Sequence, residues 1–183
     1  ADRNALITFI VVVLIGAAVA WACSQGGTTT GGIPVFALIV GLIFLIQWVV
    51  FIPSFVRQTE HFYDLTGSFT YITMTVLAVL LSPPAGGRQL LLLGMVLIWA
   101  ARLGTYLFRR VRRAGKDSRF DEIKPHFLRY LNTWTIQGLW ISLTLAAALA
   151  TITTTVRKEL DLWAVIGLLV WAAGLSLEAT ADI

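Results

Sequence analysis

Charged residues are scarce in this chain. Only 13% of its 183 residues are Asp, Glu, Lys or Arg, whereas a soluble domain of this length usually has about a quarter. Hydrophobic residues make up 57% of the sequence. Too few polar side chains remain to cover a surface that faces water, so the composition excludes an ordinary soluble domain. It favours a protein whose surface faces the hydrocarbon of a lipid bilayer.

Several catalytic and metal-binding patterns are also absent. Cys23 is the single cysteine, which excludes an intrachain disulfide. His61 and His126 have no second histidine or cysteine at ligand spacing, so we expect no metal site. The sequence contains neither a G-x-G-x-x-G pattern after a strand nor a Walker loop, so both usual nucleotide fingerprints are missing. Nothing indicates a Ser-His-Asp arrangement.

Six long apolar segments follow one another along the sequence. They lie near residues 5–23, 34–56, 61–81, 89–108, 131–151 and 162–179. Each has about 20 residues, the length of an α-helix that crosses a bilayer. The sequence therefore predicts an all-α fold, a polytopic transmembrane bundle of about six spans, with residues 1–183 in one transmembrane domain. We interpret the first segment as a retained helix, with a removed signal peptide as the alternative. The Gly- and Thr-rich residues 24–32 are expected to form a flexible connector.

Lysine and arginine are concentrated in residues 109–130, between the fourth and fifth apolar segments. Eight of the 14 cations lie there. If this segment is a cytoplasmic loop, Arg3 and Arg57 are cytoplasmic as well. Ten cations then lie inside against three outside, which are Arg88, Arg157 and Lys158. This bias predicts that both termini lie in the cytoplasm.

Anionic lipid headgroups are the expected partners of the basic segment 109–130. Guanidinium groups also match phosphate oxygens, so phosphate binding by the arginines of this segment is the sharper alternative. Nucleic acid is not expected as a partner, because the segment is short and anchored at both ends.

Five polar residues interrupt five different apolar segments: Gln47, Asp64, Arg102, Gln137 and Glu178. In the predicted orientation all five fall in the cytoplasmic half of the bilayer. Ionisable groups in hydrocarbon normally face a partner or a wet cavity, so this clustering predicts a shared polar cavity open to the cytosol. For the two glutamines we favour interhelical hydrogen bonds. For Asp64 and Arg102, a structural pair and a substrate or cofactor cavity both stay open, whereas Glu178 is expected to reach interfacial water.

Helical spacing adds two neighbours to these charges. Ser68 follows Asp64 at i+4, and Tyr106 follows Arg102 at i+4, so each pair shares one helix face. We expect an ion pair between Asp64 and Arg102, because the two charges lie at similar depth. Ser68 is expected to line the polar cavity together with Gln47, Gln137 and Glu178.

A succession of short motifs runs through the second half of the chain. It consists of W-x-x-R-L at residues 99–103, two arginines at 109–110 and G-K-D-S-R-F at 115–120. F-Y-D-L at 62–65 and the closing E-A-T-A-D at 178–182 accompany it. Over nearly its whole length the chain resembles bacterial membrane proteins of unknown function related to the steroid 5-alpha-reductase family. That superfamily also contains sterol reductases and isoprenylcysteine carboxyl methyltransferases.

This resemblance implies a lipid-modifying enzyme. A complete member would reduce a carbon–carbon double bond of a lipid-like substrate with NADPH, or would transfer a methyl group. Arg102 and Tyr106, with Asp64, are the catalytic residues that the resemblance implies, because they could polarise or protonate a substrate carbonyl. The cofactor-binding residues that it implies are Arg110, Asp117 and Arg119.

Relatives of this kind continue past the E-x-x-x-D segment through an R-H-P-N-Y-type motif, which this chain lacks. We therefore expect the chain to correspond to the N-terminal part of such an enzyme and not to be catalytic as it stands. The alternative is a non-enzymatic accessory subunit that packs against other subunits of a membrane complex. A transporter is less favoured, because no inverted repeat is evident.

Overall fold

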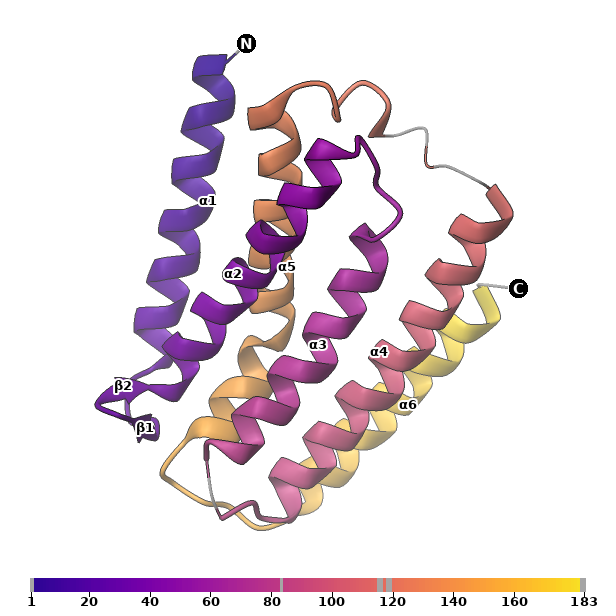
Figure 1. Ribbon diagram of the computed structural model, residues 1–183. Helices are drawn as coiled ribbons and strands as arrows, with labels where there is room; N and C mark the ends of the chain where they lie inside the picture. Colours follow the sequence, from indigo (N-terminus) through magenta and orange to yellow (C-terminus); the bar gives the residue numbers. More distant parts are fainter. Residues whose placement is uncertain (1, 83, 115–116, 118–119, 182–183) are drawn as a thin grey trace.

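The computed structural model describes residues 2–82, 84–114, 117 and 120–181, and these residues form six α-helices and one short β-hairpin (Figure 1). The helices are α1 (Asp2–Cys23), α2 (Val35–Val56), α3 (Tyr63–Leu80), α4 (Gly87–Ala114), α5 (Phe127–Thr153) and α6 (Leu162–Ala181). The predicted all-α bundle is confirmed.

Five of these helices, all except α3, are long and apolar enough to cross a membrane. Their mean hydropathy reaches 2.9 in α2, and apolar side chains point outward from the bundle. Leu14 of α1 is 62% exposed and Leu177 of α6 is 72% exposed. Exposed apolar side chains at this density require lipid as the surrounding solvent. The chain is a multi-pass integral membrane protein.

Helix α3 has 18 residues and contacts α2, α4 and α5. Its hydroxyl side chains bond to its own backbone: Thr70 Oγ1 donates to Thr66 O at 2.7 Å and Thr75 Oγ1 to Tyr71 O at 2.8 Å. A helix shielded by protein on several sides needs less apolar surface than one that faces lipid. Its contacts with three helices can therefore accommodate Asp64 and the hydroxyl side chains of α3.

The ends of the basic segment 109–130 are helical. Helix α4 continues through Arg109 and Arg110 to Ala114, and α5 begins at Phe127. Arginine is a good helix former, and cations in the last turn of a helix interact favourably with its dipole. The connection between α4 and α5 is therefore shorter than the expected loop.

Residues 24–32, which we expected to form a flexible connector, contain the first strand and the turn of an antiparallel hairpin of β1 (Thr29–Thr30) and β2 (Ile33–Pro34). Gly31 and Gly32 form its turn with φ angles of +57° and +81°, which only glycine adopts without cost. The Thr28 amide also donates to the Thr153 carbonyl at 2.7 Å. These bonds tie the connector to the end of α5.

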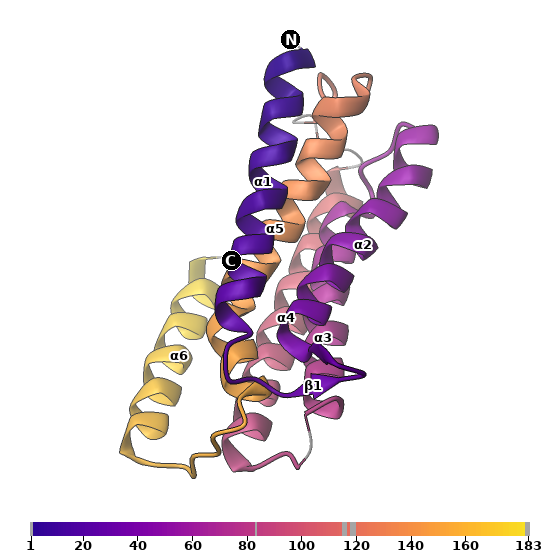
Figure 2. The same cartoon turned by 90° about the vertical axis from the view of Figure 1, so that its left-hand side faces the viewer.

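Helix α1 lies at one edge of the bundle, and α4 and α6 lie at the other (Figure 1). The core is formed mainly by Ile39, Ile43 and Phe44 of α2 with Leu145 and Leu149 of α5. Helix α6 has no buried residue and packs against α4, and it stands apart from α1 in the turned view (Figure 2). We call the end with the N-terminus and the α2–α3 and α4–α5 connections the basic end. The end with the hairpin and the α3–α4 and α5–α6 connections is the opposite end.

Candidate functional site

An ion pair joins α4 to α6. Arg102 Nη1 donates to Glu178 Oε1 at 2.9 Å, and Trp99 Nε1 donates to Glu178 Oε2 at 3.1 Å. Glu178, which we expected to reach interfacial water, is therefore held through both carboxylate oxygens by two donors one turn apart on α4. Such pairing lowers the cost of placing a charge within a membrane span.

A second ion pair joins α3 to α4 nearer the basic end. Asp64 Oδ2 lies 3.9 Å from Arg110 Nη2. The ion-pair partner that the structure gives for Arg102 is thus Glu178, and the one that it gives for Asp64 is Arg110; a direct Asp64–Arg102 contact stays a prediction. Tyr106 is partly buried, one turn beyond Arg102 on α4.

The two glutamines form interhelical hydrogen bonds, as we favoured. Gln47 is fully buried and its Nε2 donates to Thr70 Oγ1 at 3.1 Å, which links α2 to α3. Gln137 Nε2 donates to the Tyr63 carbonyl at 3.1 Å, which links α5 to α3. The Oε1 atom of each glutamine is buried and has no partner among the described residues.

Helix α3 approaches its neighbours closely at two glycines. A Cβ atom on Gly104 of α4 would lie 2.7 Å from the Cβ atom of Ser68. A Cβ atom on Gly67 would lie 2.6 Å from Gln137 Nε2. Ser68 is buried in the first of these contacts, and its hydroxyl has no hydrogen-bond partner among the described residues. These contacts let the polar residues of α3 reach α4 and α5.

A hollow of about 490 Å³ lies between α4, α5 and α6. Its walls are mainly Leu, Val, Met, Ala and Trp side chains, and Trp99 and Glu178 are among its lining residues. A Cβ atom on Gly174, which also lines it, would meet nothing within 4 Å. Of the five polar residues expected to share a cavity, Glu178 lines this hollow, whereas the other four do not. A volume of this size is within the range of ligand pockets.

Behind the lining residue Trp99, a second aromatic residue packs within the bundle. The ring of Tyr71 from α3 meets that of Trp99 edge-on, with centroids 4.9 Å apart. Tyr71 is buried, and its hydroxyl interacts with the side chain of Thr144 of α5, which also lines the hollow. Tyr71 follows Asp64 by seven residues, so the two lie on one face of α3, but this spacing alone does not assign Tyr71 to a site.

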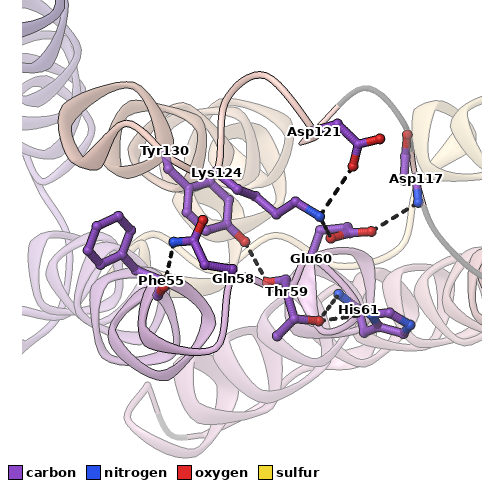
Figure 3. A network of polar contacts seen from close by, with 9 residues as sticks. All are labelled: Phe55, Gln58, Thr59, Glu60, His61, Asp117, Asp121, Lys124 and Tyr130. Atoms are coloured by element: carbon purple, nitrogen blue, oxygen red, sulfur yellow. Dashed lines mark hydrogen bonds and ion pairs between the residues drawn. The ribbon is translucent and has the colours of Figure 1, made fainter.

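A polar network closes the basic end between the α2–α3 and α4–α5 connections (Figure 3). Glu60 Oε2 contacts Lys124 Nζ at 2.5 Å, and Glu60 Oε1 accepts the Asp117 backbone N–H at 3.0 Å. Lys124 also lies 3.5 Å from Asp121. Tyr130, fully buried at the start of α5, donates its hydroxyl proton to the Thr59 carbonyl at 2.7 Å. The network therefore fixes two connections that are far apart in sequence.

The pKa values of Glu60 and Lys124 in this network are both shifted so that the charged forms are favoured. Burial by itself raises the pKa of Glu60, but the hydrogen bonds from Lys124 and from the Asp117 amide outweigh it, and the net pKa is lowered from its ordinary 4.5. Burial lowers the pKa of Lys124, and Glu60 and Asp121 outweigh that effect, so its pKa is raised above 10.5. Both residues are charged at neutral pH.

The three residues that the resemblance implies for cofactor binding are Arg110, Asp117 and Arg119, and the structure describes two of them, at or beside this network. Asp117 is held by its backbone amide against Glu60, which leaves its carboxylate outside that hydrogen bond. Arg110 is exposed at the end of α4 beside Asp64. Arg119 lies outside the described residues. Sequence reasoning did not single out Glu60, because no spacing rule connects a glutamate in one loop with a lysine 64 positions later.

Metal ligation is not indicated by the described residues, which contain no group of three or more His, Cys, Asp or Glu side chains that could hold a metal ion.

The comparison with protein families gives one match. A family model described as "Protein of unknown function (DUF1295)" matches residues 48–183. The chain belongs to this family. No curated protein matches the chain, and no solved structure does. The DUF1295 region begins directly after Gln47 and contains both ion pairs of α4, the hollow and the Glu60–Lys124 network, whereas α1 lies outside it.

Proposed function

We propose that this chain is a steroid-reductase-like membrane protein that binds the apolar part of a lipid-like substrate in the hollow between α4, α5 and α6. The observation that carries this proposal is the hollow itself, which is apolar along most of its wall and carries Glu178 on that wall. Arg102 and Trp99 hold Glu178 in place from α4. An amphipathic molecule with one polar group suits such a lining.

The proposed reaction is the reduction of a carbon–carbon double bond, or alternatively methyl transfer, and it rests on the resemblance described above. In a complete enzyme of this kind, Arg102 and Tyr106 would polarise or protonate a carbonyl of the substrate, with Asp64 as a further catalytic residue. Tyr71, whose ring packs edge-on against that of Trp99, is an additional group that can orient the substrate.

NADPH is the proposed cofactor of the reductase, and it would supply a hydride. The residues of the basic end fit its phosphates, because the adjacent Arg109 and Arg110 are exposed there and guanidinium groups bind phosphate oxygens in pairs. Arg110 lies eight residues beyond Arg102, about 12 Å along a helix axis. An elongated cofactor anchored at Arg110 can therefore extend toward the substrate. Asp117 lies beside this entrance through its contact with Glu60.

We also propose that the basic end faces the cytoplasm and that the protein lies in the bacterial inner membrane. Arg3, Arg57, Arg109 and Arg110 all belong to this end. Positive charge accumulates on the cytoplasmic side of membrane proteins. This orientation gives a cytosolic cofactor direct access to the α4–α5 connection.

A second candidate function is that of an accessory subunit in a membrane complex. Helix α6 favours it, because no residue of this helix is buried and its apolar side chains, such as Leu162 and Val170, are about 70% exposed (71% and 68%). The mass of the purified protein in mild detergent discriminates between the two functions. A stable monomer counts against the subunit.

The substrate hollow is tested by filling it. Gly174→Leu places a side chain where a Cβ meets nothing, and Gly167→Leu does the same on α6 at a position that does not line the hollow. Overfilling an occupied space costs about 1–3 kcal/mol, so we expect G174L to reduce labelling by a photoreactive sterol or prenyl probe about fivefold or more. The G167L control should label like the wild type. Equal labelling of all three proteins would exclude this hollow as the substrate site.

A further inference from the structure

Three cations gather at one corner of the opposite end, where the positive-inside rule predicts few. Arg88 comes from the start of α4, and Arg157 and Lys158 come from the α5–α6 connection. The two regions are about 70 residues apart in sequence and are joined by a hydrogen bond from Arg88 Nη2 to the Glu159 carbonyl at 2.8 Å. Cations that meet in this way need an anionic partner.

Two of these cations are fixed by the protein. Arg88 Nη2 also forms an ion pair with Asp161 at 2.8 Å. Arg157 donates to the Ile152 carbonyl at 3.2 Å and to the Ser82 carbonyl at 2.9 Å. The third cation differs, because within residues 84–114 and 120–181 no hydrogen bond or ion pair holds the Lys158 ammonium group, and it is exposed.

Arg88 and Lys158 line the same hollow of about 360 Å³. Its other lining residues include Gln89, Thr151 and Thr154, which are neutral and polar, and Val156, which is apolar. Arg88 Nε is buried and has no hydrogen-bond partner among the described residues, so the guanidinium is not fully used by Asp161 and Glu159. The charged side chains of this corner are Arg88, Arg157 and Lys158 against Glu159 and Asp161, so one positive charge remains.

We propose that this hollow binds the phosphate of a membrane glycerophospholipid, with Lys158 and Arg88 as its cationic ligands. One surplus positive charge matches the single negative charge of a phosphodiester. The hollow lies at the ends of membrane-crossing helices and has an apolar residue on its wall, so the acyl chains of the lipid can follow the surface of α5. The site is distinct from the α4–α5–α6 substrate hollow, because the two share no lining residue.

Native mass spectrometry of the full chain, released from a mild detergent and titrated with phosphatidylglycerol, tests this proposal. Lys158→Gln removes the cation without breaking any protein contact. A charged hydrogen bond contributes about 1.5–3 kcal/mol, so we expect K158Q to raise the Kd for phosphatidylglycerol about tenfold. Arg57→Gln removes an exposed arginine at the basic end and serves as the matched control, with an unchanged Kd.

The alternatives give different results. Equal Kd values for wild type and K158Q overturn the site. An equal rise in the Kd of K158Q and of R57Q also overturns it, because general charge attraction then explains the binding. Competition by millimolar inorganic phosphate or glycerol 3-phosphate identifies a free phosphate as the ligand and overturns the assignment to lipid. Because this assay needs neither substrate nor NADPH, its outcome is independent of the proposed enzyme activity.

Discussion

The Glu60–Lys124 pair gives the sharpest test of how the basic end is held together. The side chain of Glu60 is 3% exposed and that of Lys124 is 13% exposed. Replacing Glu60 by alanine removes the ion pair and the hydrogen bond from the Asp117 amide. It also leaves the Lys124 ammonium in a nearly dry position, with Asp121 at 3.5 Å as its remaining partner.

The expected cost follows from these contacts. Breaking a buried pair by removing one partner costs about 3–5 kcal/mol. Because Lys124 keeps Asp121 and a little solvent contact, we expect the lower end, about 3 kcal/mol for E60A. At about 2–4 °C per kcal/mol, this corresponds to a Tm lowered by roughly 6–12 °C. Thermal unfolding of the protein in detergent, followed by tryptophan fluorescence, measures the change.

Glu122→Ala is the matched control, because Glu122 is exposed in the same connection and has no hydrogen bond or ion pair among the described residues. We expect E122A to change the free energy of unfolding by less than about 0.5 kcal/mol. The double variant E60Q/K124M removes both charges and should recover part of the loss, since no charge is then stranded. If E60A unfolds at the same temperature as E122A, the pair does not hold the two connections together.

Two further predictions concern pH and helix packing. The folded pKa of Glu60 lies below 4.5, so its contribution to stability is present above about pH 4.5 and is lost as the pH falls through the folded pKa. The difference in Tm between wild type and E60A should therefore shrink in acid. A difference that does not change with pH would contradict this origin of the stability. Gly104→Ala places a Cβ 2.7 Å from that of Ser68 and should destabilise the α3–α4 contact by about 1–3 kcal/mol. Gly94→Ala on the same helix meets nothing within 4 Å and should stabilise by about 0.5–1 kcal/mol, so similar melting temperatures for the two variants would refute the close approach.

The polar residues within the apolar helices show how far sequence reasoning reached. Arg102, Glu178, Gln47 and Gln137 were recognised because a polar side chain in an apolar run is costly and therefore needs a reason. Their partners were not recognised. Arg102 bonds to Glu178 across 76 residues of sequence, and a helical pattern fixes which face a residue lies on but not which helix lies opposite.

The sequence by itself determined that this protein is helical, that it lies in a membrane and that its cations favour one end. Each of these depends on quantities summed along a short stretch of chain, such as apolar length and local charge. Only the tertiary structure decided that α3 packs against α2, α4 and α5, that α6 is held mainly by α4 and that Glu60 meets Lys124. Those contacts join segments distant in the chain, and their free energy arises from packing and charge pairing that no single stretch contains.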